Sequence, residues 1–322
     1  NKNKHTMKNY AKLIKLTLLV VTSTLMFSCS DDDSTTQDRT ITEFISKNPT
    51  FTNLYAALEK AELSETLNQS GQFTIFAPTN DAFAEFLAVN GFENLEAVPT
   101  PVLKEILLNH VLNARVPSSD VSTGYVKTLA KGSASSTNTL SMFINVSESG
   151  VRINGVSSVT AFDINASNGV VHVVDAVIGL PTIVTHALAN PNFSTLVGAL
   201  TSPGQPDFVG ILSGNTNSPF TVFAPSNAAF TRFETQNPGT LGSLTSGQLT
   251  SVLTYHVVAG ANVLSTGIPS GPITTFETGT FTVNGTTITD EAGRQTNIVA
   301  VDVQAANGVI HVLDNVILPN LN

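Results

Sequence analysis

The segment FTIFAPTNDAF at residues 73–83 returns almost unchanged as FTVFAPSNAAF at residues 220–230. Three further motifs recur in the same order: NPTFTNL (48–54) with NPNFSTL (190–196), LLNHV (107–111) with LTYHV (253–257), and SNGVVHVVD (167–175) with ANGVIHVLD (306–314). The copies are offset by 139 to 147 residues. One unit of domain size is therefore written twice, which excludes a solenoid of short repeats.

The repeat also sets the domain organisation. The last motif of the first copy ends shortly before Leu180-Pro181, so we place the boundary there. The first repeat then covers residues 40–180, and the second repeat covers residues 181–320. The chain has 322 residues, of which 41% are hydrophobic and only 12% are charged. This composition supplies enough apolar material for two cores and is not typical of a disordered chain.

Both copies of the first motif predict a short strand followed by a helix. The run Phe73–Phe76 is β-prone, and Pro78 ends it. Asn80 and Asn227 stand at the start of the helices that follow, where a side chain that caps the helix N-terminus is expected. We therefore predict that these two asparagines are N-caps.

One histidine per repeat follows an apolar helical face. His110 continues a stripe of leucine and isoleucine, and His256 repeats this pattern in the second repeat. A histidine on such a stripe is more often a core residue that is hydrogen-bonded to the backbone than a ligand. We interpret both as structural.

A second histidine per repeat lies in the strand that follows an asparagine-glycine turn signal. The strands that carry His172 and His311 are apolar almost throughout, which predicts burial on both faces. These histidines are again interpreted as structural. Asp175 and Asp314 end the same strands and are predicted to bond local backbone.

Together, the repeated motifs resemble the fasciclin domain. The resemblance covers about residues 40–180 and 181–320, nearly all of the chain after its N-terminal segment. It implies an α+β fold of two tandem fasciclin-like domains, each a wedge of two β-sheets with α-helices packed around it. It also implies adhesion or binding at a cell surface or matrix, without enzymatic activity.

The resemblance further implies candidate adhesion residues. The Tyr-His element that animal relatives use for integrin recognition is matched by Tyr255-His256, whereas the first repeat has Asn109 in place of the tyrosine. An Asp-Ile element with a similar role is matched by Asp163-Ile164 and Asp302-Val303. Packing is the alternative role for these β-prone pairs. Because the second repeat keeps Tyr255-His256 and Asp302-Val303, we expect it to dominate binding.

The chain shows no pattern of a catalytic or metal site. The nucleophile elbow, the His-Glu-x-x-His motif, the Walker loop and the dinucleotide fingerprint are absent from the sequence. The histidines and aspartates suffice in number for a Ser/His/Asp set, but no serine or threonine stands in an activating context. A single cysteine excludes a cysteine-based zinc cluster, and two histidines make a poor metal site. We predict no catalytic residue, no metal and no cofactor.

Residues 1–28 have the pattern of a signal peptide. Met7 is taken as the start, and three lysines precede the mostly apolar segment 16–27. This segment is too short to cross a bilayer, and no apolar run in the chain reaches the roughly 18 residues of a membrane-spanning helix.

Cys29, the only cysteine, follows a small residue in a context that resembles the lipobox of bacterial lipoproteins. We predict that Cys29 carries lipid, with an ordinary signal peptide and an incidental cysteine as the alternative. Residues 29–39 contain the run SDDDSTT at 30–36 and are predicted to be an acidic tether. Such a run resembles a surface-export signal, so an outer-membrane lipoprotein exposed at the cell surface is expected.

Charge restricts the partners. After Cys29 the chain has 10 lysines and arginines against 24 acidic residues, a net charge of −14. Nucleic acids and sulfated glycans would be repelled, so an extracellular protein or a neutral polysaccharide is the expected ligand. A surface adhesin is the first hypothesis. An envelope accessory lipoprotein that captures a glycan or scaffolds an outer-membrane complex is the second.

Overall fold

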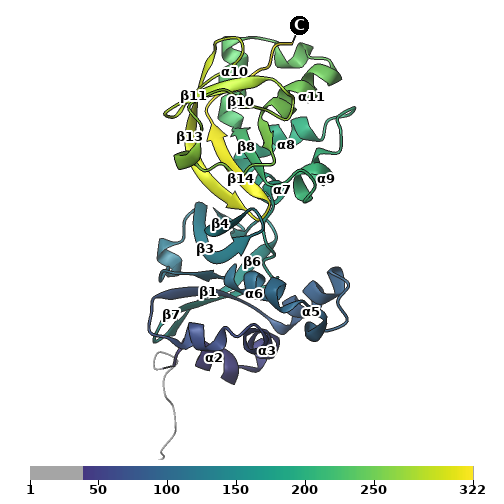
Figure 1. Cartoon of the computed structure of the whole chain (residues 1–322). Helices are drawn as coiled ribbons and strands as arrows, with labels where there is room; N and C mark the ends of the chain where they lie inside the picture. Colours follow the sequence, from purple (N-terminus) through teal and green to yellow (C-terminus); the bar gives the residue numbers. More distant parts are fainter. Residues whose placement is uncertain (1–38, 322) are drawn as a thin grey trace, which may run out of the picture. The chain divides into compact units, whose positions relative to one another are not determined.

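The computed structural model describes residues 39–321 (Figure 1). The predicted signal peptide, Cys29 and almost all of the predicted tether lie outside the described residues. Across residues 39–321, no helix combines the length and the apolar character that a membrane crossing requires.

The first repeat combines short helices with seven strands. Its helices are α2 (Ile41–Lys47), α3 (Thr52–Lys60), α4 (Ser64–Asn68), α5 (Asn80–Val89) and α6 (Thr100–Leu108). Its strands are β1 (Phe73–Pro78), β2 (Val111–Leu112), β3 (Gly124–Gly132), β4 (Ser135–Ser147), β5 (Gly150–Ile153), β6 (Ser157–Ala166) and β7 (Gly169–Val174).

The second repeat follows the same plan. Its helices are α7 (Ile183–Ala189), α8 (Ser194–Leu200), α9 (Phe208–Ser213), α10 (Asn227–Gln236) and α11 (Ser246–Tyr255). Its strands are β8 (Phe220–Pro225), β9 (Val257–Ala259), β10 (Ile273–Thr274), β11 (Thr280–Asn284), β12 (Thr287–Thr289), β13 (Gln295–Ala305) and β14 (Gly308–Leu313).

Each repeat builds one seven-stranded sheet, in the orders β2-β1-β7-β6-β5-β4-β3 and β10-β11-β12-β13-β14-β8-β9. The pairs β1–β7 and β8–β14 are parallel and lie side by side in Figure 1. Strands β6 and β13 shift register partway along, where Asp163 and Asp302 each have a φ of 59°. Such bulges bend a strand, and here they join the two halves of the predicted wedge. The predicted α+β fold of two tandem domains is confirmed.

The cores form where the apolar patterns predict. In the first repeat, Phe51, Leu54 and Val171 belong to one buried cluster under α2, α3 and α4. In the second repeat, Phe193 and Ile310 belong to the equivalent cluster. All but one residue of β7 and of β14 is buried, because helices cover one side of each strand and the bent sheet covers the other.

The glycine after each asparagine allows two strands to approach closely. A Cβ atom on Gly169 would lie 2.1 Å from the carbonyl oxygen of Phe73, and one on Gly308 would lie 2.2 Å from that of Phe220. These distances are far inside van der Waals contact, so only glycine fits against β1 and β8.

The predicted N-caps are wrong, and the correction shows what the two asparagines do. Thr79 caps α5 and Ser226 caps α10, because these residues have the extended backbone that a cap requires. Asn80 is instead the first residue of its helix, and its Oδ1 accepts the main-chain N–H of Asn53 at 3.0 Å. The side chain therefore caps α3, whose own N-cap residue provides no side-chain bond.

Asn227 repeats this arrangement in the second repeat. Its Oδ1 accepts the N–H of Thr195 at 2.9 Å, and its amide donates to the carbonyl oxygen of Pro191 at 2.9 Å. The asparagine of each motif thus ties two helices together.

Candidate functional site

The Tyr-His element of the second repeat is buried. Tyr255 is 0% exposed, and its hydroxyl donates to the carbonyl oxygen of Thr280 at 2.7 Å and accepts from the N–H of Glu291. His256 lies within 2.7 Å of the Val252 carbonyl through Nδ1, and its Nε2 accepts from the N–H of Ile317. Every polar atom of this element is engaged within the protein.

The histidine of the first repeat has the same surroundings. His110 Nδ1 lies 2.7 Å from the Ile106 carbonyl oxygen, and Nε2 accepts from the N–H of Ile178 at 2.9 Å. Asn109 takes the place of the tyrosine, is fully buried, and donates to the carbonyl oxygen of Gly179 at 3.0 Å. These contacts hold the end of α6 against the segment that follows β7.

The two strand histidines fasten loops to the sheet. His172 and His311 are 0% exposed, and their Nε2 atoms lie 2.9 Å from the carbonyl oxygens of Val116 and Val263. All four motif histidines are therefore buried, as their apolar surroundings predict.

Burial makes these imidazoles poor bases. Desolvation lowers the pKa of His110 and His256 from the ordinary 6.5 to about 4, and it does the same for His186, a further buried histidine in α7. It also lowers the pKa of His172 and of His311. These imidazoles are therefore weaker bases than an exposed histidine.

These lowered pKa values predict acid sensitivity. Between about pH 6.5 and pH 4 the unfolded chain binds more protons than the folded chain, so the free energy of unfolding falls as the pH is lowered through this range. At pH 5 we expect a loss on the order of 2 kcal/mol for each of these three histidines.

Urea unfolding at pH 7.5 and pH 5 measures this loss. His186 corresponds to Phe44 in the first repeat, so the variant His186→Phe introduces the residue that the first repeat has at this position. In this variant, the difference in the free energy of unfolding between pH 7.5 and pH 5 should be smaller. Equal urea midpoints at both pH values for the unmodified chain would contradict the prediction.

The Asp-Ile and Asp-Val elements sit on the two β-bulges. The carboxylate of Asp163 accepts from the N–H and the hydroxyl of Ser118, and these bonds lower its pKa. Asp302 accepts from the N–H and the hydroxyl of Ser265 at 2.8 and 2.6 Å. Asp163 thus fastens its bulge to the loop before β3, and Asp302 fastens its bulge to the loop before β10.

The aliphatic partners of these aspartates face inward. Ile164 packs against the core of the first repeat, and Val303 is only 5% exposed within the core of the second. The main chain of Asp302 is also engaged, because its carbonyl oxygen accepts from Lys127 Nζ of the first repeat at 2.9 Å. Asp302 therefore has a contact with the other repeat that is not described for Asp163.

Asp175 and Asp314 bond backbone, but that backbone belongs to the neighbouring strand and is not local in sequence. Asp175 accepts from the N–H of Ser158 at 2.7 Å, and Asp314 accepts from that of Asn297 at 2.7 Å. Asp314 also pairs with Arg232 at 2.6 Å.

No Ser/His/Asp set is assembled from these residues. The two ring nitrogens of His172 contact the carbonyl oxygen of Val116 and the N–H of Asp163. Asp175 accepts from the N–H of Ser158 and does not contact a histidine through this bond. Within residues 39–321 there is also no group of three side chains that could hold a metal ion.

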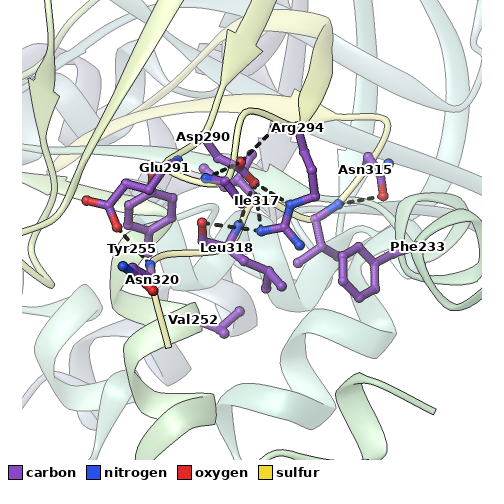
Figure 2. A network of polar contacts seen from close by, with 12 residues as sticks. Phe233, Val252, Tyr255, Asp290, Glu291, Arg294, Asn315, Ile317, Leu318 and Asn320 are labelled. Atoms are coloured by element: carbon purple, nitrogen blue, oxygen red, sulfur yellow. Dashed lines mark hydrogen bonds and ion pairs between the residues drawn. The ribbon is translucent and has the colours of Figure 1, made fainter. Parts of the chain in front are cut away.

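An ion pair near Tyr255, of which only the carboxylate is fully buried, was not anticipated from the sequence (Figure 2). Asp290 has a fully buried carboxylate, which pairs with the guanidinium of Arg294 at 2.9 Å. The guanidinium carbon lies 6.0 Å from the centre of the Phe233 ring. Opposite charges at i and i+4 indicate an ion pair when both residues lie on a helix. Asp290 and Arg294 lie in the loop between β12 and β13, so this rule does not predict their contact.

Comparison with known proteins agrees with this architecture. The fasciclin domain model matches residues 49–181 and 191–319. Protein sll1483 of Synechocystis is 39% identical over 139 residues, which are 43% of this chain and 72% of that protein. Immunogenic protein MPB70 of Mycobacterium bovis is 34% identical over 134 residues, which are 40% of this chain and 65% of that protein.

Longer matches are more distant. The transforming growth factor-beta-induced protein ig-h3 of Sus scrofa is 29% identical over 293 residues, which are 84% of this chain and 38% of that protein. A solved FAS1 domain pair from the insect cell adhesion molecule fasciclin I matches 85% of this chain and 97% of its own, with a TM-score of 0.53 and 20% identity. This last likeness is one of fold. Because the family model matches more than half of the chain in two separate copies, the protein belongs to the fasciclin domain family.

Proposed function

We propose that this protein is a non-enzymatic adhesion protein of the cell surface, which holds an extracellular protein or a neutral polysaccharide through its fasciclin domains. The observation that carries the proposal is the pair of fasciclin domains, because a domain pair of the same fold occurs in the cell adhesion molecule fasciclin I. The internal use of the motif histidines and aspartates supports binding rather than catalysis.

Anchoring is part of the same proposal. Cys29 carries lipid in the outer membrane, and the acidic residues after it form a tether that directs the protein to the cell surface. Many anchored copies, each with two linked domains, raise the effective concentration of weak sites. The net charge of −14 after Cys29 favours partners without a polyanionic surface.

For the binding face we propose the surface around Asp163 rather than Tyr255 or Asp302. Phe162 is 38% exposed beside Asp163, so an apolar ring and a carboxylate lie next to each other at the surface of the bulge. Tyr255 and His256 are buried, so substitutions there would act through unfolding. This choice moves the expected contact from the second repeat to the first.

Retention of cells on surfaces coated with matrix proteins or neutral polysaccharides tests the proposal. Cells that express the full chain should be retained, and Cys29→Ser should release the protein into the soluble fraction and abolish retention. Phe162→Ala leaves the bonds from Asp163 to Ser118 in place and should lower retention about tenfold, the effect of one contact worth roughly 1.4 kcal/mol. Val89→Ala, at a position that is 78% exposed, should not lower it. No retention at any coating, with co-purification of an outer-membrane complex, would favour the accessory lipoprotein instead.

A further inference from the structure

A cleft opens in the second repeat between α8, α10, α11 and the 3₁₀ turn Leu241–Ser243. Its inner part has a volume of about 310 Å³ and is almost wholly apolar, with walls that include Leu196, Ala199, Phe230, Leu249 and Leu253. A wider outer part of about 530 Å³ adjoins it and shares Thr195, Phe230 and Leu241. An apolar floor with a polar entrance is the usual form of a small-ligand site.

The corresponding place in the first repeat holds more apolar side chains. Phe83 is 1% exposed there, whereas its counterpart Phe230 is only partly buried. Leu87 and Phe92 pack against the core of the first repeat. The second repeat has Glu234 at the place of Leu87, and the segment NGFENL (90–95) is shortened to NPGTL (237–241), which has no aromatic residue. The second repeat thus lacks two apolar side chains that pack here in the first repeat.

The wall of the cleft is held in position. The carboxylate of Glu234 accepts the main-chain N–H groups of Gly239 and Leu241, each at 2.9 Å. These bonds fix the shortened loop at the rim. Val252 and Val316 line the floor, and the C-terminal segment behind them is tied to Asp290 through the N–H of Leu318. Figure 2 shows Val252 beside this network.

The polar groups at the entrance are already used within the protein. Thr231 donates to the carbonyl oxygen of Asn227 at 3.1 Å, and Thr235 donates to that of Thr231 at 2.8 Å. Glu234 is the one charged residue among those that line either part of the cleft, and it is occupied by the loop. An anionic ligand would find no cation here, and a strongly polar one would find few free partners.

From these observations we propose that the cleft binds an uncharged aromatic group of about two fused rings. A buried apolar cavity of about 150 Å³ is large enough for benzene, so the inner part is large enough for two rings. Such a ring system is found both in free indole-like compounds and in the tryptophan side chain of a protein. The inference is independent of the adhesive role.

Titration of the full chain with the neutral probe N-phenyl-1-naphthylamine tests the proposal by fluorescence. Saturable binding is expected. Thr195→Phe should weaken it by at least about tenfold, which corresponds to roughly 1.4 kcal/mol, because the new ring occupies the junction of the two parts. Thr195 is exposed and uses its main-chain N–H for the bond to Asn227, so the substitution keeps that bond. Thr195→Ser is the matched control and should bind as the unmodified chain does.

Competition then separates the two sources of the ring. Displacement of the probe by indole alone indicates a free ligand, and displacement by both indole and a short tryptophan peptide indicates that a protein side chain is also accepted. No saturable binding, or unchanged binding by Thr195→Phe, overturns the proposal. If Thr195→Phe melts below the control, Thr195→Leu gives the same comparison with a smaller side chain.

Discussion

Asp290→Ala is expected to destabilise the second repeat by roughly 3 kcal/mol, because several main-chain donors lose a charged acceptor in the interior. The carboxylate accepts from the N–H groups of Ala292, Arg294 and Leu318 in addition to its pair with the guanidinium. Without it, three main-chain donors and a cation that is 33% exposed lose their partner together. The network in Figure 2 also fastens the C-terminal segment, so its loss should loosen the packing around Val316 and Leu318.

Urea unfolding of the full chain at neutral pH measures this effect. Asp290→Asn keeps an acceptor oxygen and should lose less stability than Asp290→Ala. The exposed Glu148→Ala serves as the control and should leave the midpoint unchanged. A loss of less than 1 kcal/mol for Asp290→Ala would mean that the carboxylate is not the centre of the network.

Asn307→Ala should be similarly severe, with an expected loss on the order of 3 kcal/mol or more. Asn307 is 2% exposed and accepts from the N–H of Ile183 at 3.0 Å. Its amide donates to the carbonyl oxygens of Leu212 and Gly214 at 2.8 and 3.2 Å. The side chain thus joins α7 and α9 to the β13–β14 turn, and alanine would leave these groups unpaired in the interior.

Asn168 is the counterpart of Asn307 in the first repeat, so Asn168→Ala should cause a similar loss of stability. Asn168 accepts from the N–H of Ile41 and donates to the carbonyl oxygens of Leu67 and Gln69, with all three distances between 2.8 and 2.9 Å. Thermal unfolding of both variants distinguishes two roles. A residue that only shaped the turn would cost roughly 0.5 kcal/mol or less on replacement, and a result of that size would contradict the buried role.

The architecture was predictable because it rests on local patterns. The repeated motifs, the apolar runs of β7 and β14, and the stripe before His110 and His256 specify strands and helix faces through the period of the side chains, and burial follows from the apolar face. The four histidines were correctly placed in the interior for this reason. A motif that recurs at domain-sized spacing also determined that there are two domains.

The partners of each polar side chain were decided only by the tertiary structure. Asn80 reaches α3, Asp175 reaches the neighbouring strand, and Tyr255 closes a network with the loop before β13, because packing brings together segments that are far apart in sequence. A spacing rule sees only neighbours within a few residues, so it assigned Asn80 to its own helix. The resemblance to the family placed Tyr255 on a binding surface, whereas packing buries this side chain.

The cleft of the second repeat could not be predicted from the sequence either. Its existence depends on side chains that are missing from the places of Leu87 and Phe92, and a missing side chain leaves a space only if its neighbours stay where they are. The sequence records the substitution to Glu234 and the shortened loop. Only the tertiary structure shows that the helices do not close over the gap and that the loop is hydrogen-bonded to Glu234 at its rim.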